Sequence, residues 1–203
     1  MRLLGPLGLL LILLGEGLSF VHILPWSQYV FPLFWYGYIL LLDSLNHRLR
    51  GYSLISSRSG EVLLMLTVSA FYWYLFEWYN MAIQNWLYIN TPPEKWIQIT
   101  MKIVSFATVI PALYETADLL GVQSWGEKAA GTRPLIPGHW RNSSLIFLVL
   151  GIFLSFLPFI IPKLFFWSVW VGPFFLLDSI NDRLGRPSLL RDWQKGELGR
   201  TAV

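Results

Sequence analysis

The sequence contains no cysteine among its 203 residues, and only 13% of the residues are charged. Without cysteine there is no disulfide, thiol nucleophile, thiolate metal site or lipid-anchored cysteine. The low charge is also unusual, because about a quarter of the residues of soluble domains are charged. The formal net charge of +3 is too small to indicate binding to nucleic acid. These absences exclude several kinds of enzyme and point away from an ordinary soluble domain.

Apolar and aromatic residues make up most of what is present. The sequence is 55% hydrophobic and 17% aromatic, with a mean hydropathy of +0.51. Several apolar runs approach the roughly 20 residues that a helix needs to cross a bilayer. Aromatic residues flank many of these runs, as they do at membrane interfaces. The composition therefore predicts an all-α, polytopic membrane helical bundle of about six transmembrane helices, at Leu3–Leu24, Gln28–Leu45, Val62–Ala82, Trp96–Leu120, Leu145–Ile161 and Lys163–Ile180.

A stretch of 23 residues occurs twice in the chain. Residues Phe34–Ser56 and Val169–Arg191 align without gaps and share eleven identities, including the pattern DSxNxRL followed by SL. Shared hydrophobicity would explain common leucines but not this polar pattern. Because four predicted spans separate the start of one copy from the start of the next, the two copies point in the same direction. The sequence therefore predicts a parallel internal repeat.

The repeat predicts three parts of the chain. The first repeat unit, residues 1–120, has four transmembrane helices, and a Gly- and Pro-containing cytoplasmic linker follows at residues 121–142. The second unit, residues 143–203, has two transmembrane helices and a basic cytoplasmic tail, so the second copy is truncated relative to the first. We expect a homo-oligomer or a partner subunit to complete the second repeat.

The positions of lysine and arginine predict the orientation. Twelve of the fifteen basic residues fall on one side of the predicted membrane, and only Lys95, Lys102 and Lys163 fall on the other. Because cytoplasmic loops carry an excess of basic residues, both termini are expected to be cytoplasmic. The first span lacks a small-residue cleavage site, which predicts an uncleaved helix rather than a signal peptide.

Two glutamates lie at similar depth in the outer half of their predicted spans, Glu16 and Glu77. Ionisable residues inside a membrane are functional candidates by default, so Glu77 and Glu16 are predicted to line a pocket and to donate a proton. The alternative is that these groups only form hydrogen bonds between helices. The residues expected to bind substrate around Glu77 are Trp73, Tyr74, Trp78, Asn80, Gln84 and, from the first span, His22.

Each copy of the repeat carries a polar motif at the inner end of its helix. A carboxylate at a helix C-terminus opposes the helix dipole, so each aspartate is expected to pair with an arginine in a structural turn. The alternative is a site for an anionic headgroup, with arginine binding a phosphate. The motif residues are Asp43, Asn46 and Arg48 in the first copy and Asp178, Asn181 and Arg183 in the second.

Two further acids, Glu115 and Asp118, lie on one face near the inner end of the fourth span. Pro111 lies one turn earlier and would free the carbonyl of Ala107, which predicts a kink. This arrangement indicates either a gate or proton path, or an ordinary interfacial helix end. No metal or cofactor site is predicted, because the histidines lie in different segments and no set of ligands has metal-binding spacing.

Three segments carry a resemblance to known proteins: WYGYILLLDSLNHRLRGYSL, FYWYLFEWYNMAIQNWLY and WVGPFFLLDSINDRLGRPSLL. With them the chain resembles an uncharacterised family of bacterial aromatic-rich multi-pass membrane proteins. The resemblance implies a multi-pass protein of the bacterial inner (cytoplasmic) membrane, and it implies no activity. The chain is more loosely similar to the integral-membrane lycopene cyclases, but it lacks their paired-Glu motif.

Three classes of function are compatible with these patterns. The leading hypothesis is an integral membrane protein that binds or transforms a hydrophobic, isoprenoid- or lipid-like substrate near Glu77. In an enzymatic form, Glu77 or Glu16 would protonate a double bond, and aromatic rings would stabilise the cation. The alternative is a non-catalytic accessory or assembly subunit of a membrane complex. A transporter is the third class, disfavoured because alternating access normally uses two complete repeats.

Overall fold

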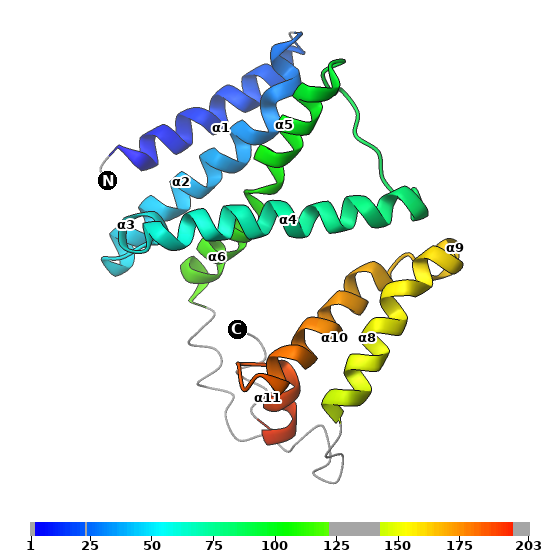
Figure 1. Ribbon diagram of the computed structural model, residues 1–203. Helices are drawn as coiled ribbons and strands as arrows, with labels where there is room; N and C mark the ends of the chain where they lie inside the picture. Colours follow the sequence, from blue (N-terminus) through cyan, green and yellow to red (C-terminus); the bar gives the residue numbers. More distant parts are fainter. Residues whose placement is uncertain (1–2, 23, 122–142, 197–203) are drawn as a thin grey trace. The chain divides into compact units, whose positions relative to one another are not determined.

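The computed structural model describes residues 3–22, 24–121 and 143–196 (Figure 1). All regular secondary structure in these ranges is helical, which confirms the all-α prediction. The helices are α1 (Leu4–Val21), the 3₁₀ helix η1 (Trp26–Tyr29), α2 (Val30–Arg50), α3 (Leu54–Ser57), α4 (Ser59–Ile83), α5 (Lys95–Phe106), α6 (Val109–Leu120), α8 (Ser143–Ile160), α9 (Pro162–Phe165), α10 (Ser168–Arg183) and α11 (Leu189–Lys195).

Within the described ranges, four helical segments are long and apolar enough to cross a membrane: α1, α4, the α5–α6 segment Lys95–Leu120, and α8. The predicted spans Gln28–Leu45 and Lys163–Ile180 correspond to α2 and α10. These two helices are less apolar or shorter, because each ends in the polar DSxNxR motif and α10 has only 16 residues. Their membrane crossing stays a prediction.

The chain forms two compact units. The first contains Met1–Leu75 and Leu87–Leu120, and the second contains Phe76–Trp86 and Gly121–Val203. Helix α4 therefore belongs to the first unit up to Leu75 and to the second from Phe76 onwards. The predicted division into residues 1–120, 121–142 and 143–203 stays a prediction, and the contacts assign the last turns of α4 to the second unit.

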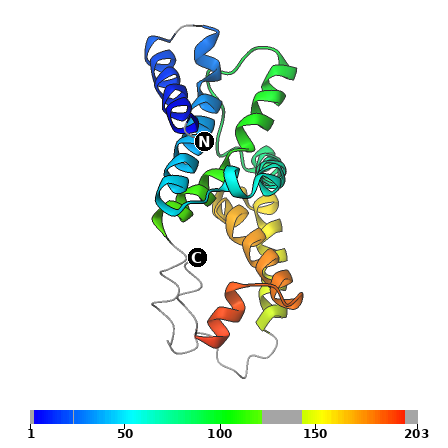
Figure 2. The ribbon, with the colours of Figure 1, turned by 90° about the vertical axis from the view of Figure 1, so that its left-hand side faces the viewer.

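In the first unit, α1 and α2 pack against each other as an antiparallel hairpin (Figures 1 and 2). The helices approach so closely that a β-carbon at Gly8 would lie 2.6 Å from the carbonyl oxygen of Gly37 and 2.7 Å from the nitrogen of Leu41. Small residues allow such backbone contact between membrane helices, where packing replaces the hydrophobic effect as the driving force. Glycine at positions 8 and 37 thus sets the separation of this hairpin.

In the second unit, α8 and α10 form a hairpin with the same kind of contact. A β-carbon at Gly151 would lie 2.5 Å from the nitrogen of Leu176 and 3.0 Å from the carbonyl oxygen of Gly172. Gly172 and Leu176 occupy the same alignment positions as Gly37 and Leu41 in the repeated sequence. The two hairpins therefore use corresponding backbone atoms at their points of closest approach.

The fourth predicted span is interrupted close to Pro111, where the sequence predicts a kink. Helix α5 ends at Phe106 and α6 begins at Val109. Ser69 of α4 bridges the break, because its hydroxyl donates to the carbonyl of Phe106 (2.5 Å) and accepts the N–H of Ile110 (3.1 Å). A buried hydroxyl thus satisfies backbone groups that a continuous helix would pair internally, as apolar surroundings require. The break turns α6 into a separate helix that packs on α2.

Aromatic stacking holds the end of α4 within the second unit. Phe76 is buried and stacks on Trp170 with ring centroids 4.1 Å apart, and Tyr79 is buried and stacks on Phe159 at 5.2 Å. Stacked aromatic pairs contribute about 0.5–1.5 kcal/mol beyond the area they bury. The aromatic abundance of the sequence is therefore used in part for packing between helices.

Candidate functional site

The two aspartates of the repeated motif bind backbone N–H groups. Asp43 accepts the N–H of Ile55 at 2.7 Å. Asp178 accepts the N–H groups of Leu189 and Leu190 at 2.8 and 3.0 Å. Both aspartates are almost fully buried and thereby hold the N-terminus of the short helix that follows, α3 or α11. A helix N-terminus presents unpaired N–H groups and attracts negative charge, so the motif stabilises the turn directly.

This pairing differs from the predicted pairing with arginine. Arg48 and Arg183 are both exposed and form no ion pair with Asp43 or Asp178 in the part of the chain that the structure describes. Backbone N–H groups come from the adjacent short helix at no cost in side-chain entropy, whereas an arginine side chain must be ordered to make the same contact. The expected structural turn is present, but its partners are backbone groups.

Helix α6 brings a second carboxyl group to the first copy of the motif. Glu115 is fully buried, and the side-chain amide of Asn46 donates to both its Oε2 (2.5 Å) and its backbone carbonyl (2.9 Å). The Glu115 carboxyl also lies within hydrogen-bonding reach of Asp43, and the N–H of Leu54 interacts with it. The first unit thus holds a buried cluster of two acids and one amide, formed by α2, α6 and the start of α3.

A cation lies beside this cluster without binding it. Arg58 donates a hydrogen bond to the hydroxyl of Tyr114, stacks over that ring at 4.6 Å, and forms an ion pair with Glu61 at 3.6 Å. The hydrogen bond to Tyr114 raises the pKa of Arg58 above its ordinary value, so the guanidinium stays charged. The positive charge of Arg58 also interacts electrostatically with Asp118. Arg58 thus stabilises the rim of the cluster around α6.

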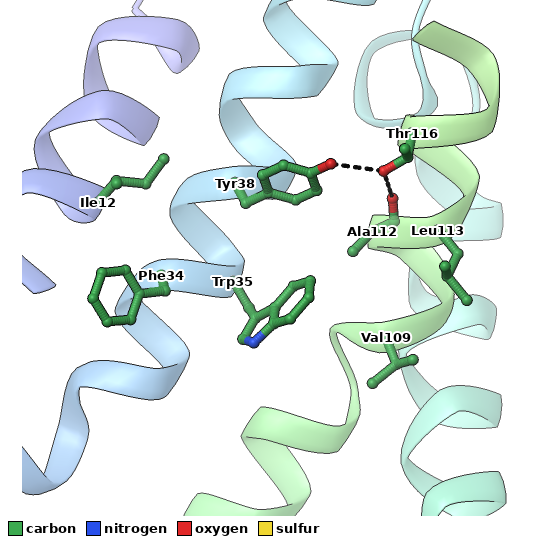
Figure 3. A pocket seen from close by; sticks show the side chains of 8 residues that line it. All are labelled: Ile12, Phe34, Trp35, Tyr38, Val109, Ala112, Leu113 and Thr116. Atoms are coloured by element: carbon green, nitrogen blue, oxygen red, sulfur yellow. Dashed lines mark hydrogen bonds between the residues drawn. The ribbon is translucent and has the colours of Figure 1, made fainter. Parts of the chain in front are cut away.

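An apolar cavity of about 580 Å³ is lined by side chains of α1, α2 and α6 (Figure 3). Two hydroxyl groups belong to its lining: those of Tyr38 and Thr116 are 2.9 Å apart, and Thr116 donates to the carbonyl of Ala112 at 2.6 Å. Thr116 follows Glu115 directly on α6, so the cavity and the acidic cluster share this helix. The lining residues are Ile12, Phe34, Trp35, Tyr38, Val109, Ala112, Leu113 and Thr116.

A second cavity, of about 990 Å³, is lined by α1 and the last turns of α2. Aliphatic residues form most of its wall, and Ser44, His47 and Arg48 supply the polar part. The guanidinium of Arg48 has no ion pair among the described residues, and it is the group that the headgroup alternative requires to bind a phosphate. The structure thus leaves Arg48 accessible beside an apolar wall.

Glu77 and Asn80 hold the segment that follows α4. Trp86 donates its indole N–H to Glu77 at 3.0 Å. The side chain of Asn80 donates to the carbonyl of Trp86 (2.7 Å) and accepts the N–H groups of Asn85 (2.9 Å) and Trp86 (3.2 Å). Gln84 adopts a left-handed conformation with φ 49°, where the chain leaves the helix. These contacts stabilise the segment that follows α4, and they are made within one stretch of chain rather than between helices as the alternative expected.

The other predicted site residues are divided between the two units. In the first unit, Glu16 and His22 are exposed, and His22 terminates α1 in a left-handed conformation. Trp73 and Tyr74, also in the first unit, contact the ring of Phe106 at centroid distances of 5.9 and 5.4 Å. The second unit contains Trp78, Glu77, Asn80 and Gln84. Trp78 is half exposed, and its ring centroid lies 4.8 Å from that of Phe159. A role of these residues in substrate binding stays a prediction.

The second copy of the motif lacks the partner that α6 gives to the first. Asn181 is exposed, whereas the corresponding Asn46 is fully buried against Glu115. Asp178 uses both of its oxygens for backbone N–H groups, and no second carboxyl group contacts it among the described residues. The same motif therefore has two different surroundings.

Sequence reasoning missed the contact between Asn46 and Glu115 and the residues of the apolar cavity. The acids of the fourth span and the DSxN pattern were both visible, but nothing in the sequence paired them across 69 positions. The cavity gives no local signal, because its lining is composed of ordinary apolar residues. Within the described ranges, no group of three or more His, Cys, Asp or Glu side chains could hold a metal ion.

Comparison with known proteins gives no match. No family model, no curated protein and no solved structure matches the chain. The resemblance inferred from the sequence segments therefore stays a prediction, and the geometry of the site is the basis for its interpretation.

Proposed function

We propose that this chain is a membrane protein that binds a hydrophobic, isoprenoid- or lipid-like molecule in the cavity lined by α1, α2 and α6. The observation that carries the proposal is the cavity itself. Its volume of about 580 Å³ lies within the ~300–1,000 Å³ range of small-molecule sites, which combine apolar walls with a few polar groups. Here the Tyr38–Thr116 hydroxyl pair is the polar element, and it would orient a ligand that carries one oxygen function.

The proposal differs in one respect from the expectation based on sequence. The ligand lies beside Tyr38 and Thr116 rather than around Glu77, whose carboxylate accepts a hydrogen bond from Trp86. Binding is the activity proposed here. Proton transfer by Glu77 or Glu16 would be a further step that the cavity does not require.

The proposed topology has six spans, with both termini in the cytoplasm and the helices in a bacterial inner membrane. Its support is the distribution of basic residues along the sequence. Reporter fusions test it: a fusion at Thr91 should report the outside and one at Gly131 the inside. The reverse pattern would contradict the topology.

The binding proposal is tested by identifying what the protein retains. The chain is purified in a mild detergent, and the retained hydrophobic molecules are measured by mass spectrometry relative to bulk lipid. Val109→Trp places a large ring in the cavity and is expected to lower retention severalfold. Leu120→Trp is the matched control, because Leu120 lies on the same helix but does not line this cavity.

The outcome is read from both variants together. Loss of the retained molecule in Val109→Trp but not in Leu120→Trp supports the cavity as the binding site. Equal retention in wild type and Val109→Trp, or the absence of any molecule enriched over bulk lipid in wild type, would contradict the proposal.

A second candidate function is that of a subunit in a membrane complex. The specific observation is the exposed Asn181, whose counterpart Asn46 is covered by an acid-bearing helix. A partner subunit that presents a helix with a carboxylate would complete the second motif as α6 completes the first.

The absence of cysteine makes this candidate easy to test. Asn181→Cys introduces a single thiol, which is treated with a water-soluble maleimide in native membranes. Slow labelling that becomes fast after detergent dissociation indicates a covering partner. Fast labelling in membranes, together with a stable monomer in native mass spectrometry, would exclude it.

A further inference from the structure

The Asp43–Glu115 pair is short of hydrogen-bond donors. Asp43 accepts one backbone N–H through Oδ1, and Glu115 accepts the Asn46 amide through Oε2. The remaining carboxyl oxygens, Oδ2 of Asp43 and Oε1 of Glu115, have no hydrogen-bond partner. Both side chains are at least 99% buried, and the two carboxyl groups lie within hydrogen-bonding reach of each other. Two buried oxygens of neighbouring carboxyl groups are therefore without a hydrogen-bond donor.

Electrostatics makes the fully ionised pair unfavourable. Two negative charges in contact, away from water, repel each other strongly and have lost their solvation. The charged groups nearby do not compensate them directly. Arg58 binds Tyr114 and Glu61, His47 approaches Ser56 at 3.4 Å, and Asp118 adds another negative charge on α6. None of these forms an ion pair or hydrogen bond with either carboxyl group in the described part of the chain.

A bound metal ion accounts for the geometry less well than a proton does. Calcium takes six to eight oxygen ligands, and magnesium requires near-ideal octahedral coordination. The cluster offers three unpartnered oxygens, which are those of Asp43 and Glu115 and the amide oxygen of Asn46. A single proton between the two carboxyl groups supplies the missing donor and removes one of the two negative charges.

We propose that Asp43 and Glu115 form a buried proton-binding site, in which one proton is shared between Oδ2 of Asp43 and Oε1 of Glu115. The proton links α2 to α6, and α6 also lines the apolar cavity. This inference does not depend on what the cavity binds. It assigns to the first unit an ionisable site without a counterpart among the described residues of the second, where Asp178 has two N–H donors and no carboxyl partner.

Amide substitutions give the first test. In Glu115→Gln, the side-chain NH₂ group can donate to Oδ2 of Asp43 in place of the proton, and Asp43→Asn does the same toward Glu115. Each single variant is therefore expected to keep the melting temperature of wild type. In the double variant, two NH₂ groups face each other without an acceptor. Its melting temperature should fall by more than the sum of the two single effects.

Infrared spectroscopy gives the second test. The purified protein in lipid nanodiscs should show a carbonyl stretch of a protonated carboxylic acid at neutral pH, sensitive to exchange into D₂O. The band should disappear in Glu115→Gln and in Asp43→Asn. Asp178→Asn is the matched control and should leave the band unchanged, because both oxygens of Asp178 accept backbone N–H groups.

Three results would overturn the proposal. The first is the absence of a protonated-acid band in folded wild type at neutral pH, and the second is a band that persists in both single amide variants. The third is a melting temperature that rises with sodium or potassium concentration in wild type but not in Glu115→Gln, which would show that a metal cation occupies the site. If one single variant fails to fold, the other still decides the spectroscopic test.

Discussion

The two copies of the DSxNxRL motif show what one sequence pattern does in two surroundings. In both, an aspartate at the end of a long helix accepts N–H groups from the short helix that follows. In the first copy, α6 covers the motif, buries Asn46 and adds Glu115. In the second copy Asn181 is exposed. The motif by itself forms a turn. It becomes part of a buried acidic cluster where a third helix, α6, adds Glu115.

The hairpins that carry the motif are more alike than the sites. Gly8 and Gly37 in the first and Gly151 and Gly172 in the second allow the same backbone contacts. Helix crossing and turn therefore belong to both units, whereas the acidic cluster and the apolar cavity involve α6 and belong to the first. Substitutions at corresponding positions can separate the shared features from those of one unit.

Enlarging the glycines at the helix crossings should have the largest effect, and a similar one in both units. Gly8→Val and Gly151→Val place side-chain carbons within 2.6 and 2.5 Å of backbone atoms of the partner helix. Backbone atoms cannot move aside as a flexible side chain can. We therefore expect the free energy of unfolding to fall by about 3 kcal/mol, at the upper end of the cost of overpacking a core. Thermal unfolding in detergent measures it. Gly17→Val is the control, because nothing lies within 4 Å of its β-carbon; equal loss there would contradict the explanation.

Removing the aspartates should affect the second unit more than the first. Asp178→Ala leaves two backbone N–H groups without an acceptor, which we expect to cost about 2–3 kcal/mol. Asp43→Ala leaves one such group without an acceptor, so a smaller loss of about 1–2 kcal/mol is expected. Urea or thermal unfolding of both variants shows which of them loses more stability. A larger loss for Asp43→Ala would indicate that its contact with Glu115 is strongly stabilising.

The asparagines should show the opposite asymmetry. Asn46→Ala removes the donor of two hydrogen bonds to buried Glu115 and should cost about 1–2 kcal/mol. Asn181→Ala changes an exposed side chain and should stay within about 0.5 kcal/mol. The same unfolding measurement applies to both, with the protein in detergent. A cost at Asn181 equal to that at Asn46 would mean that a partner covers the second motif.

Glu77→Gln should have the smallest effect. The amide oxygen can still accept the indole N–H of Trp86, so a change in stability within about 0.5 kcal/mol is expected. Retention of the hydrophobic molecule should also be unchanged if it binds in the cavity of α1, α2 and α6. Loss of the molecule from a variant that still folds would instead indicate that it binds near Glu77, as the sequence predicts.

The helical segments were predictable because their signals are local. Apolar runs, the polar motif at helix ends and Pro111 are each visible within one stretch of sequence, and the break before Val109 occurs where Pro111 indicated a kink. The partners of Asp43 and Asp178 were not predicted, because a charge on arginine is apparent in sequence and an unpaired N–H group is not. A structural role for Glu77 and Asn80 was considered only as an alternative, in the form of hydrogen bonds between helices. Their actual partners could not be predicted, because they depend on how residues 84–86 fold back on α4.

The sequence by itself determined that this chain is helical and rich in membrane-compatible segments, and that one polar motif ends two of its helices. Hydropathy and short spacing carry this information, because they act within a few turns of the chain. Only the tertiary structure decided that Glu115 meets Asn46 and Asp43, and that α1, α2 and α6 line a cavity. These features arise from contacts between residues tens of positions apart. Such contacts depend on which helix faces pack together, and the apolar periodicity of a membrane helix hardly distinguishes one face from another.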